Sequence, residues 1–116
     1  MSGGVRVNCR PYAPSHVHPF CIHMVIGVIS WELEILGAQS LKEKRSVVKG
    51  LKERLHNRFN VSAAETAHQD LWQRSEITAC VVAGDTKVAE SVLQSADDLV
   101  AKEYRARIIS SQRYFQ

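Results

Sequence analysis

An alternation of apolar and polar residues in the first strongly patterned segment constrains the fold of this chain more than any other feature. The positions between the apolar residues hold serine and glutamate, and the apolar residues are Ile29, Trp31, Leu33 and Ile35. Successive side chains of a β-strand point to opposite faces, so this spacing is typical of a strand with one buried face. Residues 24–35 are therefore predicted to form the first strand, with the odd-numbered side chains turned toward the core.

A helix is predicted directly after this strand. The run Gly37-Ala38-Gln39 interrupts the strand pattern, and Ser40 is followed three residues later by Glu43, which is the spacing of a capping box. The apolar residues that recur at helical spacing are Leu41, Val48, Leu51, Leu55 and Phe59. We expect this stripe to face the core and the helix to end at Asn60.

The remaining segments complete the order of elements. Strand patterns cover residues 61–68, 74–83 and 104–115, and a helical pattern capped at Gly84-Asp85-Thr86 precedes the last of them. The order β-α-β-β-α-β is the split β-α-β signature. The sequence thus predicts an α+β, ferredoxin-like domain with an antiparallel sheet in the order 4-1-3-2 and both helices on one face.

The second helix is predicted to turn one apolar side toward this sheet. Its inward residues are expected to be Val88, Val92, Ala96 and Leu99, flanked by Ala89, Leu93 and Val100.

The sheet face away from the helices divides into two halves. In one half, Arg105 and Arg107 of the last strand are predicted to lie beside Glu34 and Glu32 as a charge cluster. The other half is an apolar patch, in which Ile109 of the last strand is predicted to lie near Val28. Its members are Met24, Ile26, Val28, Cys80, Val82 and Ile109. Exposed apolar patches commonly mark interfaces, so a homodimer is predicted here, unless the N-terminal or C-terminal residues cover the patch.

Length and composition limit the class of protein. The chain has 116 residues, 45% of them hydrophobic and 23% charged, as expected of one soluble globular domain. The longest apolar run starts at Met24 and is too short to span a bilayer. Three cysteines without framework spacing are typical of a reducing compartment, so the cytoplasm is the expected location.

Residues 1–23 differ from the rest of the chain. They hold all three prolines and the Gly3-Gly4 pair, and they show no periodicity, so an irregular extension is predicted before a domain of residues 24–116. Met24 is the expected native initiator. The potential zinc ligands of this segment match no common zinc module, and no metal or cofactor is predicted; they are Cys9, His16, His18, Cys21 and His23.

Positive charge concentrates in the first predicted helix. Residues 40–58 hold seven Lys or Arg and two Glu, a sum of +5, whereas the whole chain carries +3 and the remainder therefore carries −2. A basic helix face contacts phosphates without reading sequence, although a merely solvated face gives the same pattern. The residues predicted to contact RNA or DNA are Lys42, Lys44, Arg45, Lys49, Lys52 and Arg58.

The connection between the second and third strands is another candidate for recognition. A large indole in a short connection either packs over the edge of the core or projects as an anchor for a partner, and both alternatives stay open. The predicted partner-binding residues are His68, Asp70, Leu71, Trp72 and Arg74.

Signals for catalysis are weak. His68 and Asp70 near the turn are more typical of a structural role, and Ser40 is explained as a helix cap. Cys80 lies within a strand without an evident cationic neighbour that would activate its thiol. No Gly-rich phosphate loop is present, so no catalytic residue is assigned and enzymatic activity is not expected.

Several segments resemble the bacterial YlxP-like family, a DUF503-type domain of unknown function. They are Met24-Val-Ile-Gly-Val, Gln39-Ser-Leu-Lys-Glu-Lys-Arg-Ser-Val-Val-Lys, Asn57-Arg-Phe-Asn-Val-Ser with Ala64-Glu65, and His68-Gln-Asp-Leu-Trp-Gln-Arg. The likeness extends from Met24 to about Arg113. It implies a ferredoxin-like fold without an established activity, and a role near the ribosome or in RNA metabolism, because such genes often neighbour translation and ribosome-maturation genes.

Two hypotheses follow from the sequence. The first is a non-catalytic accessory factor that binds RNA or a ribosomal particle through the basic helix. The alternative is a small homo-oligomeric module for protein interaction or ligand sensing, which uses the open sheet face and the Trp72 connection.

Overall fold

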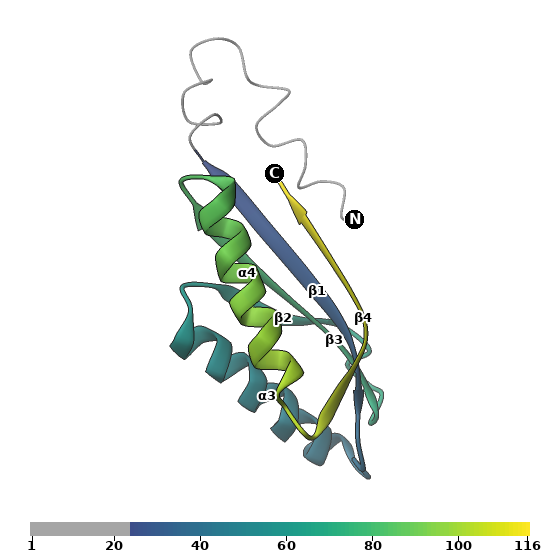
Figure 1. Cartoon of the computed structure of the whole chain (residues 1–116). Coiled ribbons are helices and arrows are strands. Elements are labelled where there is room, and N and C mark those ends of the chain that lie inside the picture. Colours follow the sequence, from purple (N-terminus) through teal and green to yellow (C-terminus); the bar gives the residue numbers. More distant parts are fainter. Residues whose placement is uncertain (1–23) are drawn as a thin grey trace.

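In the computed structural model, which describes residues 24–116, the strands and helices follow one another in the predicted order (Figure 1). The elements are β1 (Val25–Ile35), α3 (Leu41–Arg58), β2 (Ser62–Ala67), β3 (Arg74–Ala83), α4 (Thr86–Ala101) and β4 (Ala106–Phe115). All strand pairs are antiparallel and the sheet order is β2-β3-β1-β4. This is the predicted order counted from the other edge, so the ferredoxin-like α+β fold is confirmed.

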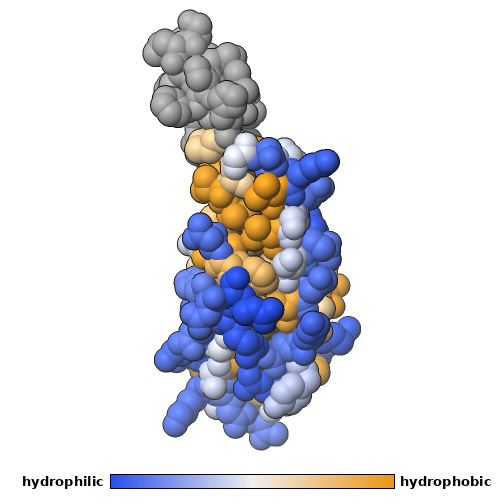
Figure 2. Space-filling model, turned by 60° about the vertical axis from the view of Figure 1, so that its left-hand side comes forward, coloured by the Kyte–Doolittle hydropathy of each residue, from blue (hydrophilic) through white to orange (hydrophobic). Residues whose placement is uncertain are grey.

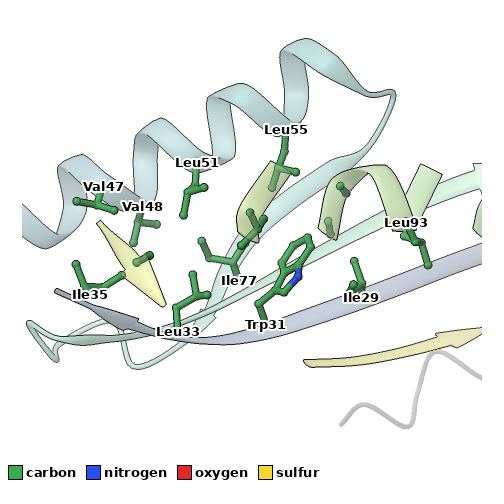
Figure 3. Close-up of a cluster of buried hydrophobic side chains, with 14 of the residues drawn as sticks. Ile29, Trp31, Leu33, Ile35, Val47, Val48, Leu51, Leu55, Ile77 and Leu93 are labelled. Atoms are coloured by element: carbon green, nitrogen blue, oxygen red, sulfur yellow. The ribbon is translucent and has the colours of Figure 1, made fainter. Parts of the chain in front are cut away.

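β1 is a central strand, and its odd-numbered side chains build the core. Ile29, Trp31 and Leu33 are fully buried, and Figure 3 shows them on the side of the strand that faces the helices. The indole Nε1 of Trp31 donates a hydrogen bond of 2.8 Å to Asp97 of α4, so the polar group of this large side chain is not left unpaired. The predicted division of β1 into a core face and an outer face is therefore confirmed.

α3 begins at the predicted cap. The hydroxyl of Ser40 accepts a hydrogen bond of 3.1 Å from the backbone N–H of Glu43, and the Glu43 carboxylate accepts one from the N–H of Gln39. The buried stripe of the helix is Lys44, Val47, Val48, Leu51 and Leu55. In Figure 3 the apolar members of this stripe point down onto the sheet. The stripe contains two residues that the sequence analysis did not place there, Lys44 and Val47. The predicted end members Leu41 and Phe59 are half-buried.

α4 is capped by Asp85, whose carboxylate accepts the N–H of Val88 at 2.8 Å. Its fully buried residues are Ala89, Leu93, Ala96 and Val100. All four belong to the predicted inward side, Ala96 as a central member and the others as flanks. The centre of that side was wrong by a rotation of the helix, because Val88 is 50% exposed and Val92 and Leu99 are half-buried. Small Ala89 faces Gly27 of β1, where an added Cβ would lie 3.3 Å from the Ala89 Cβ, so the helix approaches the sheet closely at this point.

Apolar side chains reach the surface in several places. On the face that Figure 2 shows, they gather over the upper and middle part, with hydrophilic side chains beside and below them. Large hydrophobic side chains that stay exposed include Val82, Val88, Leu71 and Trp72. Scattered exposed apolar residues are normal in a folded protein, whereas contiguous ones call for an explanation.

The pairing of β4 differs from the prediction because of a β-bulge. Glu34 lies opposite Arg107, but Glu32 lies opposite Ser110, so Ile109 has no direct partner on β1. A bulge residue shifts the alternation of every side chain that follows it. The predicted place of Ile109 beside Val28 was therefore wrong, and Tyr114 lies there instead.

The predicted contacts of two arginines shift accordingly. Arg107 binds Glu34 through its Nε at 2.9 Å, not Glu32 as predicted. Arg105 precedes the strand and binds Glu103 through its Nε at 3.0 Å, not Glu34. A charge cluster on the outer face exists, but with Arg107 as its contribution from β4.

No helix among residues 24–116 is both long and apolar enough to cross a membrane. The predicted extension 1–23 lies outside the described residues, together with its potential ligands Cys9, His16, His18, Cys21 and His23.

Candidate functional site

Four basic side chains lie along one face of α3. Lys42, Arg45, Lys49 and Lys52 follow one another at intervals of three and four residues, which keeps them on one side of a helix. The first three are exposed and Lys52 is half-buried. Within residues 24–116, none of the four takes part in an ion pair. We call these four residues the basic stripe.

Lys44 does not belong to this surface, and the prediction that it contacts nucleic acid was wrong. Its side chain is 0% exposed, and its Nζ lies 2.5 Å from the Glu65 carboxylate of β2. The same Nζ donates hydrogen bonds to the carbonyl oxygens of His68 at 2.8 Å and Gln69 at 3.3 Å. The Glu65 carboxylate also accepts a hydrogen bond from Ser75 at 2.7 Å. A buried charge needs such a full set of partners.

The sequence contained a signal for the burial of Lys44. It precedes Val47, Val48 and Leu51 by three, four and seven residues, which are the intervals of a single helix face. Glu65 carried a matching signal, because it occupies an alternate position of β2 between Ala63 and Ala67. The sequence analysis assigned no structural role to Glu65, because it did not pair this residue with the lysine on the apolar face of the first helix.

Arg58 also lies apart from the basic stripe. It lines a cavity of about 540 Å³ between the C-terminal parts of α3 and α4, and its guanidinium lies 6.0 Å from the ring of Phe59. Other residues of this cavity are Arg54, Leu99, Lys102 and Tyr104. The predicted phosphate-contacting set thus divides: four members share one face of α3, whereas Lys44 is buried and Arg58 faces the side of α4.

Glu103 also lines this cavity and is bound by two arginines. It accepts hydrogen bonds from the backbone N–H and the Nε of Arg105, both at 3.0 Å, and it pairs with Arg54. Burial alone would raise the pKa of its carboxyl, but the hydrogen bonds from Arg105 and Arg54 outweigh it and lower the pKa from 4.5 to about 2. In return, the carboxylate raises the pKa of Arg105. Arg54 and Arg105 therefore each form an ion pair with Glu103 inside the domain.

The β2–β3 connection, residues 68–73, presents its largest side chain to solvent. Trp72 is 51% exposed and Leu71 is exposed beside it, so the indole is not packed fully over the edge of the core. Its role as an anchor for a partner stays a prediction. Leu36, which follows β1, is also exposed at this end of the sheet. The backbone of His68 adopts a positive φ of 64°, and its carbonyl oxygen accepts the N–H of Leu71 at 3.1 Å.

The charged residues of this connection turn toward β1. The His68 Nε2 lies 3.0 Å from the Glu32 carboxylate, and the Arg74 guanidinium binds the same carboxylate. Burial would raise the pKa of Glu32, but the hydrogen bond from Arg74 and the charge of His68 lower it. Asp70 is exposed and forms no ion pair with residues 24–116. Of the predicted partner-binding residues, His68 and Arg74 thus make contacts within the domain. Leu71 and Trp72 are the apolar members that are exposed to solvent.

The apolar patch on the outer sheet face is present in altered form. The register aligns Ile26 with Val82, and Val28 with both Cys80 and Tyr114. Val82 is 61% exposed, and Met24 and Tyr114 are exposed as well, whereas Val28 is buried by its neighbours. Tyr114 takes the position that the prediction gave to Ile109.

Polar side chains form the middle of the outer face. The hydroxyls of Ser30, Thr78 and Thr66 are linked by two hydrogen bonds of 2.8 Å, and Thr66 also donates to Glu76 at 2.6 Å. A shallow cavity of about 210 Å³ borders Ser30 and Glu76. Cys80 is a half-buried free thiol. Among the described residues, no group of three or more His, Cys, Asp or Glu is arranged to hold a metal ion.

Comparison with known proteins gives a family. A family model described as "Protein of unknown function (DUF503)" matches residues 26–113. The uncharacterized protein YlxP of Bacillus subtilis (strain 168) is 41% identical over 70 residues, which are 60% of this chain and 76% of the relative.

Two solved structures of designed proteins are similar to this chain. Foldit4 has 10% identity and a TM-score of 0.49, over 80% of this chain and 96% of that chain. LFR1 1, designed with a ferredoxin fold, has 16% identity and a TM-score of 0.44, over 79% of this chain and 82% of that chain. The likenesses are weak, and the ferredoxin-like topology stands on the strand order itself. By the match over residues 26–113 and the identity to YlxP, the chain belongs to the DUF503 family.

Proposed function

We propose that this protein is a non-catalytic accessory factor that binds structured RNA, alone or in a ribosomal particle, through the basic stripe of α3. The observation that carries this proposal is the contrast between two groups of cations. The stripe residues Lys42, Arg45, Lys49 and Lys52 form no ion pair with the described residues. Most arginines elsewhere are held by internal carboxylates, as Arg74 is by Glu32. The genomic context implied by the family resemblance agrees with this role.

The length of the basic stripe fits a contact with the phosphate backbone of a nucleic acid. From Lys42 to Lys52 the helix rises about 15 Å, at about 1.5 Å per residue. A strand of B-form DNA advances about 3.4 Å per nucleotide, so the stripe is as long as about four nucleotides on that scale, and slightly more in the more compact A-form of RNA. Lysine contacts to phosphate position a ligand without specifying its sequence. We therefore expect affinity for RNA shape and charge, with little preference for sequence.

The salt dependence of binding tests the proposal. Four phosphate contacts correspond to a slope of about −2.8 to −3.6 in log K against log salt, or a roughly 50- to 150-fold loss of affinity between about 50 and 200 mM salt. Fluorescence anisotropy with a labelled RNA hairpin measures this slope. Replacing one stripe lysine by glutamine should reduce the slope by about 1.

A matched pair of variants separates the stripe from net charge. Lys42→Gln with Lys49→Gln removes two stripe charges, and Lys87→Gln with Lys102→Gln removes two charges from α4 and its C-cap. The first pair should weaken binding and lower the slope, whereas the second should do neither. Glu53→Gln, beside the stripe on α3, should strengthen binding. Equal effects of the two pairs would refute a localised site. Co-migration of the wild type with ribosomal subunits in a sucrose gradient, lost in the stripe variant, would identify the particle.

A second candidate function is self-association through the apolar patch of the outer sheet face. The exposure of Val82, Met24 and Tyr114 on neighbouring strands favours it. Ile26→Glu places a charge in the middle of this patch, opposite Val82. If the patch is a dimer interface, sedimentation velocity should show a dimer for the wild type and a monomer for the variant. A monomeric wild type would exclude this function.

A further inference from the structure

We propose that Trp72 is a stacking platform for an unpaired base of the RNA whose backbone lies along the basic stripe. The ligand class is then an RNA stem that continues into a single-stranded segment. This inference rests on the proposed function, since the stripe supplies the attraction to the nucleic acid. It adds a contact with a base, which the stripe itself does not provide.

The two tryptophans of the chain have opposite environments. Trp31 is 0% exposed and its indole Nε1 is hydrogen-bonded, whereas Trp72 is 51% exposed. An aromatic side chain buries about 150–250 Å² when it is fully covered, so Trp72 leaves roughly 100 Å² in water. A base that stacks on an indole covers such a surface, and every base offers a suitable face.

The backbone on both sides of Trp72 is held in place. Before it, Lys44 binds the carbonyl oxygens of His68 and Gln69. After it, the side-chain amide of Gln73 donates to the carbonyl of Ala38 at 3.0 Å, and the Gln73 carbonyl accepts the N–H of Ile35 at 2.9 Å. A platform fixed in advance loses less conformational entropy when a ligand binds. The exposed indole is thus presented by a fixed loop.

The same contacts place the Trp72 loop near the N-terminal end of α3, the end at which the basic stripe begins with Lys42. Lys44, which holds the loop, lies between Lys42 and Arg45 in the first turns of α3. At the other end of the helix, His56 accepts the backbone N–H of Ala63 near the start of β2. β2 therefore runs back along α3, from the C-terminal part of the helix to its N-terminal part, where the Trp72 loop begins. An RNA strand that follows the basic stripe toward Lys42 thus approaches the indole of Trp72.

The charges around Trp72 are compatible with a polyanion. Glu32 is neutralised by Arg74 and faces His68, and Glu34 is bound by Arg107. Asp70 is the opposing charge, because it is exposed and has no ion-pair partner within residues 24–116. Its replacement by asparagine should therefore tighten RNA binding.

The extent of apolar surface favours a base over a protein partner. Leu36, Leu71 and Trp72 are each about half exposed, and together they offer a few hundred Å² at most. A stable protein interface buries about 800 Å² on each partner. One base needs much less, and the stripe contributes electrostatic attraction to the same ligand.

Three RNAs and the full-length protein test the inference. The first is a blunt hairpin, the second carries a single-stranded purine tail, and the third carries the same tail with abasic sites, which keeps the phosphates and removes the bases. The tailed RNA should bind about 5- to 150-fold more tightly than the abasic one, the range expected for stacking of one base. Trp72→Ala should abolish this difference, while Val88→Ala, which truncates an equally exposed apolar side chain on α4, should preserve it.

The intrinsic fluorescence provides a second readout without substitution. Exposed Trp72 should be quenched by the tailed RNA and not by the abasic RNA, and the emission of buried Trp31, seen alone in Trp72→Phe, should not change. Salt-dependent binding with no effect of the bases, or no quenching, would overturn the stacking and leave the proposed function intact. Equal losses in Trp72→Ala and Val88→Ala would also overturn it, because the loss would then not be specific to the indole. Loss of salt-dependent binding altogether would refute the proposed function first.

Discussion

At the scale of single residues, the buried Lys44 connects the core to the candidate site. Its Nζ reaches the Glu65 carboxylate and two backbone carbonyls of the Trp72 loop. Lys44→Met removes one partner of a buried ion pair, so we expect a loss of about 3–5 kcal/mol in unfolding free energy. Urea denaturation followed by circular dichroism measures this loss.

A double variant provides the control for Lys44. In Lys44→Met with Glu65→Leu, no uncompensated charge remains in the core, so more than half of the lost stability should return. The loop carbonyls of His68 and Gln69 stay unbound in both variants. If the double variant were as unstable as the single one, the loop contacts and not the ion pair would dominate.

Glu103 gives the stability a defined dependence on pH. Its pKa in the folded protein is about 2, below its ordinary value of 4.5, so the carboxylate stabilises the fold at pH above 4.5 and this contribution is lost as the pH falls toward 2. Glu103→Gln should cost roughly 1–3 kcal/mol at neutral pH, since one pKa unit corresponds to about 1.4 kcal/mol and the partners are partly solvated. The difference between the two proteins should shrink below pH 4.5; a difference independent of pH would contradict this role.

The sequence predicted the roles of some single residues correctly and those of others wrongly. Ser40 and Asp85 were recognised as caps, because a cap depends only on a side chain and the backbone a few residues away. Lys44 was misplaced because a lysine on an apolar stripe is buried only if a distant carboxylate meets it, here Glu65 of β2. The exposure of Trp72 likewise depends on the tertiary contacts of its loop. Local signals were therefore sufficient for caps but not for the candidate site.

At the scale of elements, two glycines should respond oppositely to the same substitution. A Cβ on Gly27 of β1 would lie 3.1 Å from the Leu93 Cδ1 and 3.2 Å from the Phe115 Cε1, so Gly27→Ala should cost about 1–3 kcal/mol through overpacking. A Cβ on Gly50 of α3 would lie 3.8 Å from the nearest atom, in Arg105, and Gly50→Ala should stabilise the helix by about 0.5–1 kcal/mol. Thermal unfolding should show shifts of opposite sign; equal signs would contradict this account of how closely α4 packs on β1.

The sequence predicted the order of the helices and strands correctly, but it predicted less well which side of each element faces the core. Apolar periodicity gave all six described elements and the sheet order, since each element must bury one side. The face of α4 was misassigned because small Ala89 lies closest to β1 opposite Gly27, while the larger Val88 is exposed. The bulge in β4 was missed because it arises from pairing with β1, although consecutive Ile108 and Ile109 already break the alternation.

At the scale of the whole molecule, charge and apolar surface are separated. The basic stripe lies on α3, the paired charges of Glu32 and Glu34 lie at one end of the outer sheet face, and the patch around Val82 lies at the other end. An RNA contact and a self-association contact would therefore use different faces. Ile26→Glu should leave the salt slope of RNA binding unchanged.

The domain boundary at Met24 gives a final prediction for the whole chain. The family match begins at residue 26, and the buried cluster among the described residues runs from Ile29 to Ala106. We propose that a chain starting at Met24 folds by itself, with a melting temperature within about 2 °C of the full chain, because a 1 kcal/mol loss would lower it by about 4–8 °C in a domain of this size. Calorimetry of both proteins makes the comparison, and binding of the RNA hairpin should retain its affinity and salt slope. A larger fall in melting temperature would mean that residues 1–23 contribute to the stability of the folded domain, and weaker binding with an unchanged slope would assign them a contact with the RNA other than to phosphate.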